Sequence, residues 1–327
     1  MASGKPTHNG KRQSTSSVRW VTIDEEHEEQ RLDNFLLAQW RGVPKSVVYR
    51  VIRKGEVRVN RSRAKPDTRL AKGDEVRIPP VKRPEKSPAP VPGSRIQAMV
   101  EAAIVYEDDH LIVVNKPHGL AVHGGSGLQF GLIEALRAAR PKARFLELVH
   151  RLDRDTSGLV MVAKRRPALR KLQEQIRGRS ARKVYHALVA GGWPDSLDQV
   201  DAPLLRSERG GERIVVVDER GKDSLTRFRV LERFTGYTLV EAVPVTGRTH
   251  QIRVHCAFAG HPIAGDPKYM DEASVKIFRR ESGERLMLHA AGLGIVLPGS
   301  ERETFFEAPY DEAFEQFLRR LSKRSGA

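Results

Sequence analysis

The sequence has almost no cysteine, no long apolar run and too few acids to balance its bases. Cys256 is the single cysteine of the 327 residues, so a disulfide within the chain is impossible and a cluster of thiolate metal ligands is excluded. No apolar run approaches the roughly 20 residues of a membrane-spanning helix. Residues 1–17 are polar and lack the apolar stretch of a secretory signal. We therefore expect a cytoplasmic protein.

Positive charge is what the sequence has in excess. It contains 57 Lys and Arg against 41 Asp and Glu, a formal net charge of +16. A surplus of this size indicates a polyanionic partner, with RNA or DNA first and an anionic membrane surface second. The bases do not line one face of a single amphipathic helix, which favours the nucleic acid.

Composition divides the chain into four segments. Residues 1–17 are rich in Gly, Ser, Thr and Lys and are expected to be a disordered tail. Residues 79–94 contain six prolines, which predicts an extended, semi-rigid linker over 81–94. A small domain over 18–80 and a larger domain over 95–327 remain on either side.

The small domain is expected to be a basic helix–helix–strand unit. Leu32, Phe35 and Leu36 recur at helical spacing, and Ser46 is a plausible N-cap for a second helix that Gly55 ends. Residues 45–77 hold eleven Lys and Arg against four Asp and Glu, a net charge of +7. A solvated charged face usually mixes the two signs, so this imbalance favours a nucleic-acid surface.

The larger domain alternates hairpins with helices. Hairpins are expected over 104–114 and 227–243, and single strands over 159–163 and 185–190. Helices are expected over 128–140, 167–177, 252–259 and 311–321. Hairpins mixed with helices, without regular β–α–β alternation, predict an α+β fold on a mixed, largely antiparallel sheet.

The most informative stretch is His-Arg-Leu-Asp-Arg-Asp-Thr-Ser-Gly at residues 150–158. It sets Asp153 between Arg151 and Arg154. A cation within a few Å favours the ionised form of a carboxyl group, and an ionised carboxylate is what a nucleophile or a base must be. For an isolated Arg-x-Asp, a structural ion pair at a turn would be the preferred interpretation.

The nonapeptide resembles the central motif of the bacterial ribosomal large-subunit pseudouridine synthases. Further segments resemble that family in its own order: YEDDHLIVVNKPHGLAVHGG (106–125), RKVYHALVAG (182–191), PVTGRTHQIRVHCAFAGHPIAGDPKY (244–269) and LMLHAAGL (286–293). The resemblance implies a catalytic domain of the pseudouridine synthase type. It implies that Asp153 is the catalytic residue, that Tyr185 is the active-site tyrosine and that Arg253 pairs with Asp153.

Residues 31–80 resemble the small RNA-binding domain shared by a small-subunit ribosomal protein and many RNA-modifying enzymes. That resemblance implies phosphate contacts for Lys45, Arg50, Arg53 and Lys54. Arg151 is the candidate for filling the gap that a target uridine leaves when it is extruded from its helix.

The expected function is the isomerisation of specific uridines in 23S rRNA to pseudouridine, by a monomer that uses no metal and no small-molecule cofactor. Asp153 could attack the sugar, attack the base or remove a sugar proton, and the sequence does not choose among these. A synthase for another rRNA or tRNA site, or a non-catalytic RNA-binding assembly factor, are the alternatives.

Three other interpretations are weaker. Asp153 and Asp155 imitate a glycosidase carboxylate pair, but the family motif leaves position 155 open. Residues 125–127 suggest a phosphate loop, yet the spacing of the next glycine does not fit. His250, His255 and Cys256 suggest a metal site, which the lack of another thiol disfavours.

Overall fold

The chain forms two compact units, residues 1–89 and 90–327. The computed structural model describes residues 17–40, 42–81, 91–124, 130–282 and 285–325. The expected disordered tail, apart from its last residue, and most of the expected proline linker lie outside the described residues. Each unit is described by itself below.

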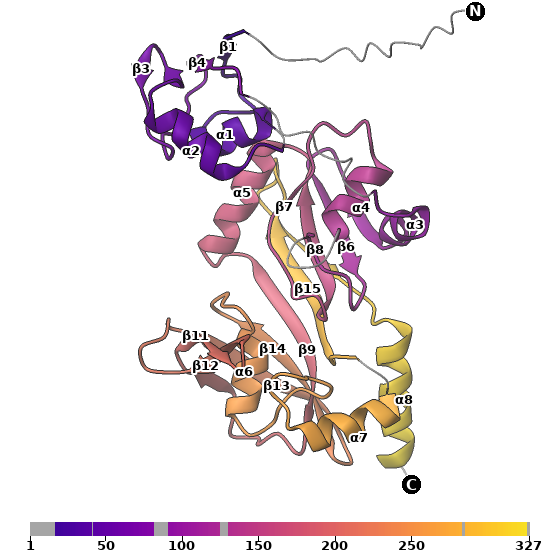
Figure 1. The fold of residues 1–327 in the computed structure, drawn as a ribbon. Helices are drawn as coiled ribbons and strands as arrows, with labels where there is room; N and C mark the ends of the chain where they lie inside the picture. The colour runs from indigo at the N-terminus through magenta and orange to yellow at the C-terminus, as the bar shows by residue number, and fades with distance from the viewer. Residues whose placement is uncertain (1–16, 41, 82–90, 125–129, 283–284, 326–327) are drawn as a thin grey trace, which may run out of the picture. The chain divides into compact units, whose positions relative to one another are not determined.

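The first unit packs two helices against a small antiparallel sheet (Figure 1). Leu32, Phe35 and Leu36 of the first helix are fully buried, as their spacing predicts. They pack in one core with Val48 and Ile52 of the second helix. The elements, with the sheet in the order β1-β4-β2-β3, are β1 (Arg19–Thr22), α1 (Leu32–Gln39), α2 (Lys45–Arg53), β2 (Arg58–Val59), β3 (Ser62–Arg63) and β4 (Glu75–Ile78).

The start of α2 differs from the expectation. Ser46 was expected to be the N-cap, but the helix already begins at Lys45, and Pro44 occupies the cap position with φ −59° and ψ 142°. No side chain caps this end. Proline fixes φ near −65° and has no N–H of its own, so the chain passes from extended backbone into the helix at this residue. Ser46 therefore lies inside the first turn.

The second unit is built on one large sheet in the order β10-β13-β14-β9-β15-β8-β6-β5. Strand β16 also pairs with β15, and β7 with β8. Among the described residues, every pairing is antiparallel except that of β8 with β15. The expected α+β fold with a mixed, largely antiparallel sheet is confirmed. The strands are β5 (Ile104–Glu107), β6 (Leu111–Lys116), β7 (Glu147–Leu148), β8 (Ser157–Ala163), β9 (Arg182–Ala190), β10 (Gln199–Asp201), β13 (Leu225–Phe234), β14 (Tyr237–Pro244), β15 (Leu288–Val296) and β16 (Glu303–Glu307).

Helices cover both faces of this sheet around β6 and β8. Ile112 and Val114 of β6 pack with Leu132 of α4, while Val113 packs with Leu172 of α5 on the opposite face. The helices are α3 (Ser94–Ala102), α4 (Leu132–Ala139), α5 (Arg166–Arg177), α6 (Gln251–Phe258), α7 (Glu272–Ser282) and α8 (Glu312–Ser325), and a separate hairpin consists of β11 (Leu204–Arg209) and β12 (Glu212–Val217). Helices α3 and α7 and this hairpin were not expected from the sequence.

Strand β8 is buried along its whole length and follows directly on the loop that carries Asp153. Gly158, at its second position, has φ +105° and lies opposite Ala290 of β15. A β-carbon at Gly158 would overlap the carbonyl oxygen of Ala290. Only glycine therefore permits the close parallel approach that fixes the end of the Asp153 loop against β15.

Within the described ranges, no helix has both the length and the apolar character needed to cross a membrane.

Substituting Gly158→Ala should destabilise the protein by more than about 3 kcal/mol, because the methyl group adds a backbone clash to a left-handed φ. Gly236→Ala is the matched control, since Gly236 has φ +79° but open space around it. Its cost should be about 1–2 kcal/mol. Urea unfolding of both variants measures the difference, and equal losses would contradict a special role for the contact with Ala290.

Candidate active site

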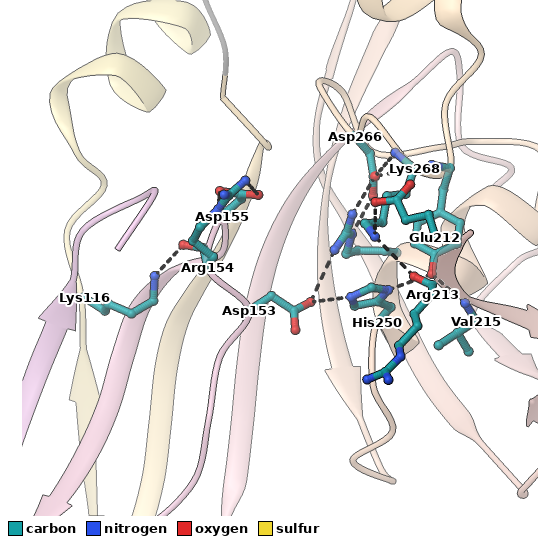
Figure 2. A network of polar contacts seen from close by, with 12 residues as sticks. Lys116, Asp153, Arg154, Asp155, Glu212, Arg213, Val215, His250, Asp266 and Lys268 are labelled. Atoms are coloured by element: carbon teal, nitrogen blue, oxygen red, sulfur yellow. Dashed lines mark hydrogen bonds and ion pairs between the residues drawn. The ribbon is translucent and has the colours of Figure 1, made fainter. Parts of the chain in front are cut away.

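Asp153 lies in the loop between β7 and β8, and its carboxylate faces two side chains of the segment around α6. Oδ2 of Asp153 is 3.4 Å from Nη1 of Arg253 and 3.6 Å from Nε2 of His250. Figure 2 shows this carboxylate pointing toward the ring of His250. The side chain of Asp153 keeps 24% of its surface exposed, against 6% for that of Arg253. The carboxylate is thus accessible while its cationic partner is buried.

Arg253 is fixed by a second carboxylate. Its Nε and Nη2 each donate to an oxygen of Asp266 at 2.7 Å, and Asp266 is fully buried. Burial alone would lower the pKa of Arg253, but the hydrogen bonds and charge of Asp266, with the charge of Asp153, raise that pKa above its ordinary value. A two-pronged arginine–carboxylate pair has a defined orientation. The remaining nitrogen of the guanidinium, Nη1, is therefore aimed at Asp153.

The cation beside Asp153 is not the one expected from the local sequence. Arg154 turns to Asp155, with which it makes hydrogen bonds of 2.9 and 3.1 Å. Arg151 is exposed and has no ion-pair partner among the described residues. Arg154 and Asp155 lie in a turn, where adjacent side chains can meet. Arg154 is therefore paired with the carboxylate that follows it and not with Asp153, which precedes it. Asp155 is paired elsewhere, which also removes the glycosidase-like carboxylate pair.

His250 was not expected beside Asp153. It precedes α6 in the left-handed conformation, with φ 55° and ψ 16°. Nδ1 lies 2.7 Å from the hydroxyl of Tyr269, which accepts the N–H of Val215 at 3.0 Å. All these groups are satisfied when Tyr269 donates to Nδ1, which leaves the proton of neutral His250 on Nε2, facing Asp153. The available sequence signal was the position of His250 three residues before Arg253 in the Thr-His-Gln-Ile-Arg motif.

Burial and nearby cations keep His250 neutral more readily than in water. Burial lowers its pKa, the negative charge of Asp153 opposes this, and the charges of Arg253 and Lys268 add to the lowering. The net pKa lies below the ordinary value for histidine. A neutral imidazole with its proton on Nε2 presents that N–H toward the Asp153 carboxylate, 3.6 Å away, without adding a full charge.

Tyr185 reaches the same place from β9, where it is paired with Ala242 of β14. Its ring packs against the apolar clusters that contain Leu152 and Leu288. Burial, and secondarily the negative charge of Asp153, raise the pKa of the Tyr185 hydroxyl above its ordinary range. Tyr185 is consequently a neutral, partly buried aromatic surface next to the carboxylate.

Lys116 holds the Asp153 loop from the side of β6. Its fully buried ammonium donates to the carbonyl oxygens of Pro117, Leu120 and Arg154 at 3.0, 2.8 and 2.9 Å. Burial lowers the pKa of Lys116 to about 7, although the charges of Asp155 and Asp153 act in the opposite direction. This lysine ties the turn after Asp153 to the end of a core strand. This role of Lys116 was not predicted from the sequence.

A cavity of about 300 Å³ opens at these residues. That volume is at the lower end of the range for sites that enclose a small molecule. It brings together Asp153, Tyr185 and Arg253, the three residues that the sequence motifs predicted to act together, and Arg151 also lines it. Its charged and polar lining groups include Arg151, Asp153, Lys183, Tyr185, His250 and Arg253.

The four bases that were predicted to contact phosphates lie in the first unit. Lys45, Arg50, Arg53 and Lys54 are exposed on α2 and at its C-terminal end, in the first unit. The suggested phosphate loop at 125–127 lies outside the described residues.

The suggested metal ligands have other partners. His255 contacts the Thr226 hydroxyl at 2.9 Å and the Ala202 carbonyl oxygen at 3.1 Å, and Cys256 is buried. In the part of the chain that the structure describes, no three His, Cys, Asp or Glu side chains are arranged to hold a metal ion.

Comparison with known families assigns both units. A sequence model described as RNA pseudouridylate synthase matches residues 110–258, a range that contains Asp153, Tyr185 and Arg253. A second model, described as S4 domain, matches residues 30–76 and so contains all of α1 and α2.

Close relatives cover nearly the whole chain. The ribosomal large subunit pseudouridine synthase C of Haemophilus influenzae is 53% identical over 308 residues, covering 94% of this chain and 96% of the relative. The protein of the same name from Escherichia coli K12 is 54% identical over 311 residues, covering 94% and 98%.

Solved structures resemble about two thirds of the chain or more. Human RNA pseudouridylate synthase domain containing 4 has a TM-score of 0.58 at 27% identity, covering 70% of this chain and 97% of that one. Human RNA pseudouridylate synthase domain containing 1 has a TM-score of 0.55 at 28% identity, covering 67% and 94%. The family expected from the sequence motifs is thereby confirmed: this chain belongs to the pseudouridine synthase family and is an isomerase with an S4 domain.

Proposed function

We propose that this protein isomerises specific uridines of 23S ribosomal RNA to pseudouridine, with Asp153 as the reacting carboxylate and without a metal ion or organic cofactor. The observation that carries the proposal is the accessible Asp153 carboxylate facing the buried Arg253 inside a cavity that Tyr185 also lines. The choice of substrate follows from relatives that share more than half of their residues with this chain and are named for the large ribosomal subunit. The protein acts as a monomer in the cytoplasm.

The reaction requires one ionised carboxylate and neither an oxidant nor an external group. The bond from uracil nitrogen to ribose breaks, the base turns over, and a bond from uracil carbon to the same ribose carbon forms. The nitrogen gains a proton and the carbon loses one, so nothing is oxidised and no external group enters. Asp153 attacks the sugar or the base, or removes a sugar proton, and each route needs a carboxylate held at a fixed position.

Arg253 supplies that fixed position. Asp266 binds Nε and Nη2 of the guanidinium, so the third nitrogen, Nη1, is directed at Asp153 before substrate arrives. A preorganised cation stabilises charge on the carboxylate without rearrangement during the reaction. His250, which carries its proton on Nε2 in the neutral form, faces the same oxygen at 3.6 Å.

Tyr185 contacts the extruded base, and Arg151 fills the position in the RNA helix that the base has left. The ring of Tyr185 stacks on uracil and excludes water, so that the detached base stays in the cavity. Extruding the uridine from its helix costs a few kcal/mol. Arg151, exposed and unpaired among the described residues, inserts where the uridine has left.

The S4 domain holds the RNA by its phosphates. Lys45, Arg50, Arg53 and Lys54 are exposed on or beside α2, whose opposite face is buried in the core of the unit. A solvent-facing row of cations on a helix suits the phosphate backbone, which carries no sequence information.

Substituting Asp153→Asn should abolish pseudouridine formation while RNA binding stays near the wild-type value, because the amide keeps the shape and loses the charge. Turnover on an RNA transcript and a filter-binding assay measure the two effects. Asp155→Asn is the matched control: it removes a carboxylate two residues away and should stay within severalfold of wild type. Asp153→Asn activity within tenfold of wild type, about 1.4 kcal/mol of barrier, would remove Asp153 from the central role.

Substituting Arg253→Gln should lower the free energy of unfolding by about 3–5 kcal/mol, because the buried Asp266 carboxylate loses its partner. Arg229→Gln is the control, since Arg229 pairs with Glu241 at the surface and should contribute about 1 kcal/mol or less. Urea unfolding compares them. If Arg253→Gln unfolds at the wild-type urea midpoint, the ion pair of Arg253 with Asp266 does not stabilise the fold.

Replacing Lys45, Arg50, Arg53 and Lys54 together by Gln should raise KM for RNA and leave kcat unchanged. Each lost phosphate contact should flatten the plot of log affinity against log salt by roughly 0.7–0.9. Replacing the four exposed bases of α8, Arg319, Arg320, Lys323 and Arg324, removes the same charge from another place and serves as the control. Identical salt slopes for the two quadruple variants would show that α2 does not hold the RNA.

A further inference from the structure

A second cavity, of about 240 Å³, adjoins the active-site cavity in the larger unit. Lys183 and Pro244 line both. The second cavity is bounded by the turn before β9, the start of β9 and the paired strands β13 and β14. It has no carboxylate among its lining residues, whereas its cationic lining residues are Arg179, Arg182, Lys183 and Arg227.

Lys183 is the link between the two cavities. It precedes Tyr185 by two positions in β9, so both side chains lie on the same face of the strand, about 6.5 Å apart along it. A β-carbon at Gly247 would lie 3.6 Å from the Lys183 nitrogen. The ammonium therefore lies beside the backbone of the segment that leads to His250 and Arg253.

The charge of Lys183 has no counter-ion. Among the described residues its nitrogen has no hydrogen-bond or ion-pair partner, although the side chain is partly buried. Burial is the sole cause that lowers the pKa of Lys183. After burial itself, the positive charge of Lys183 is what lowers the pKa of His150 to about 4. A cation withdrawn from water without a partner is unfavourable unless an anion joins it.

The other bases set the cavity apart from an ordinary surface. The Arg182 guanidinium stacks over the ring of Phe305 at 4.3 Å, which orients it without neutralising it. Arg227 is exposed on β13, opposite Val243 of β14. Four cations without an acid among them match a phosphate group, and an RNA strand carries one phosphate per nucleotide.

We propose that Lys183, together with Arg227, binds the backbone phosphate next to the target uridine and so sets the position of the extruded nucleotide. The inference rests on the proposed function. When uracil lies against Tyr185, the RNA backbone that continues along β9 passes Lys183 and enters the second cavity. Lys183, Arg227 and Arg179 form a cationic track, and Arg179, in the turn before β9, extends it for the next part of the backbone.

The first test uses a hairpin RNA that contains a uridine which the wild-type protein converts. Lys183→Met keeps the length of the side chain and removes the charge, and should raise KM about tenfold or more with kcat within severalfold of wild type. Its log KM should depend on log salt with a slope smaller by about 0.7. Lys183→Arg, which restores a cation, should recover most of the loss.

Lys276→Met is the matched control, because Lys276 is an exposed lysine on α7 paired with Glu272. It should leave KM unchanged. A Lys183→Met protein with wild-type KM and wild-type salt slope would overturn the proposal. If the wild-type protein converts no uridine in any large-subunit transcript, the proposed function fails instead, so the two failures are distinct.

The second test leaves the protein intact and modifies the RNA. Replacing one phosphate beside the target uridine by an uncharged methylphosphonate should raise KM of the wild-type enzyme about tenfold. The same replacement should have little further effect on Lys183→Met, since the two changes remove one interaction. If the Lys183→Met substitution and the methylphosphonate multiply KM independently, whichever flanking phosphate is replaced, Lys183 contacts neither phosphate.

Discussion

The site depends on one arginine that is held by a carboxylate behind it and presents a free N–H to the carboxylate in front. Asp266 is fully buried and binds two nitrogens of Arg253, which leaves Nη1 directed at Asp153. The pair fastens α6 to the turn before α7. It also fixes the position of the Arg253 guanidinium relative to the Asp153 carboxylate. Because a buried ion pair is worth little unless its geometry is well defined, the surrounding structure must keep this geometry rigid.

Three separate contacts supply that rigidity to the Asp153 loop. Arg253 faces the carboxylate, Lys116 donates to the carbonyl of Arg154, and Gly158 allows β8 to lie directly against Ala290 of β15. Each arises from a different part of the second unit, so the loop is held from several sides. A reacting group supported by locked neighbours is the arrangement that catalysis requires. On the side of Lys183 the cavity continues into the cationic track, where we expect the RNA backbone.

Local patterns predicted the fold class, and the resemblance of the motifs to the pseudouridine synthases implied the three residues that share the cavity. Neither indicated all of the neighbours of those residues. The hairpins and the buried strand after the nonapeptide follow from short-range periodicity, which sequence displays directly. The partner of Asp153 lies one hundred positions later at Arg253, and Arg154, the obvious local candidate, pairs with Asp155. Only tertiary packing decides between such alternatives. His250 was missed because a left-handed residue before a helix leaves no periodic signal.

The central claim is that this chain produces pseudouridine in large-subunit ribosomal RNA. Mapping pseudouridines across 23S rRNA from cells with and without the protein tests it most directly. We expect that a defined set of uridines loses its modification in the absence of the protein and regains it when the wild-type gene is restored. Identical pseudouridine maps from cells with and without the protein would contradict this claim.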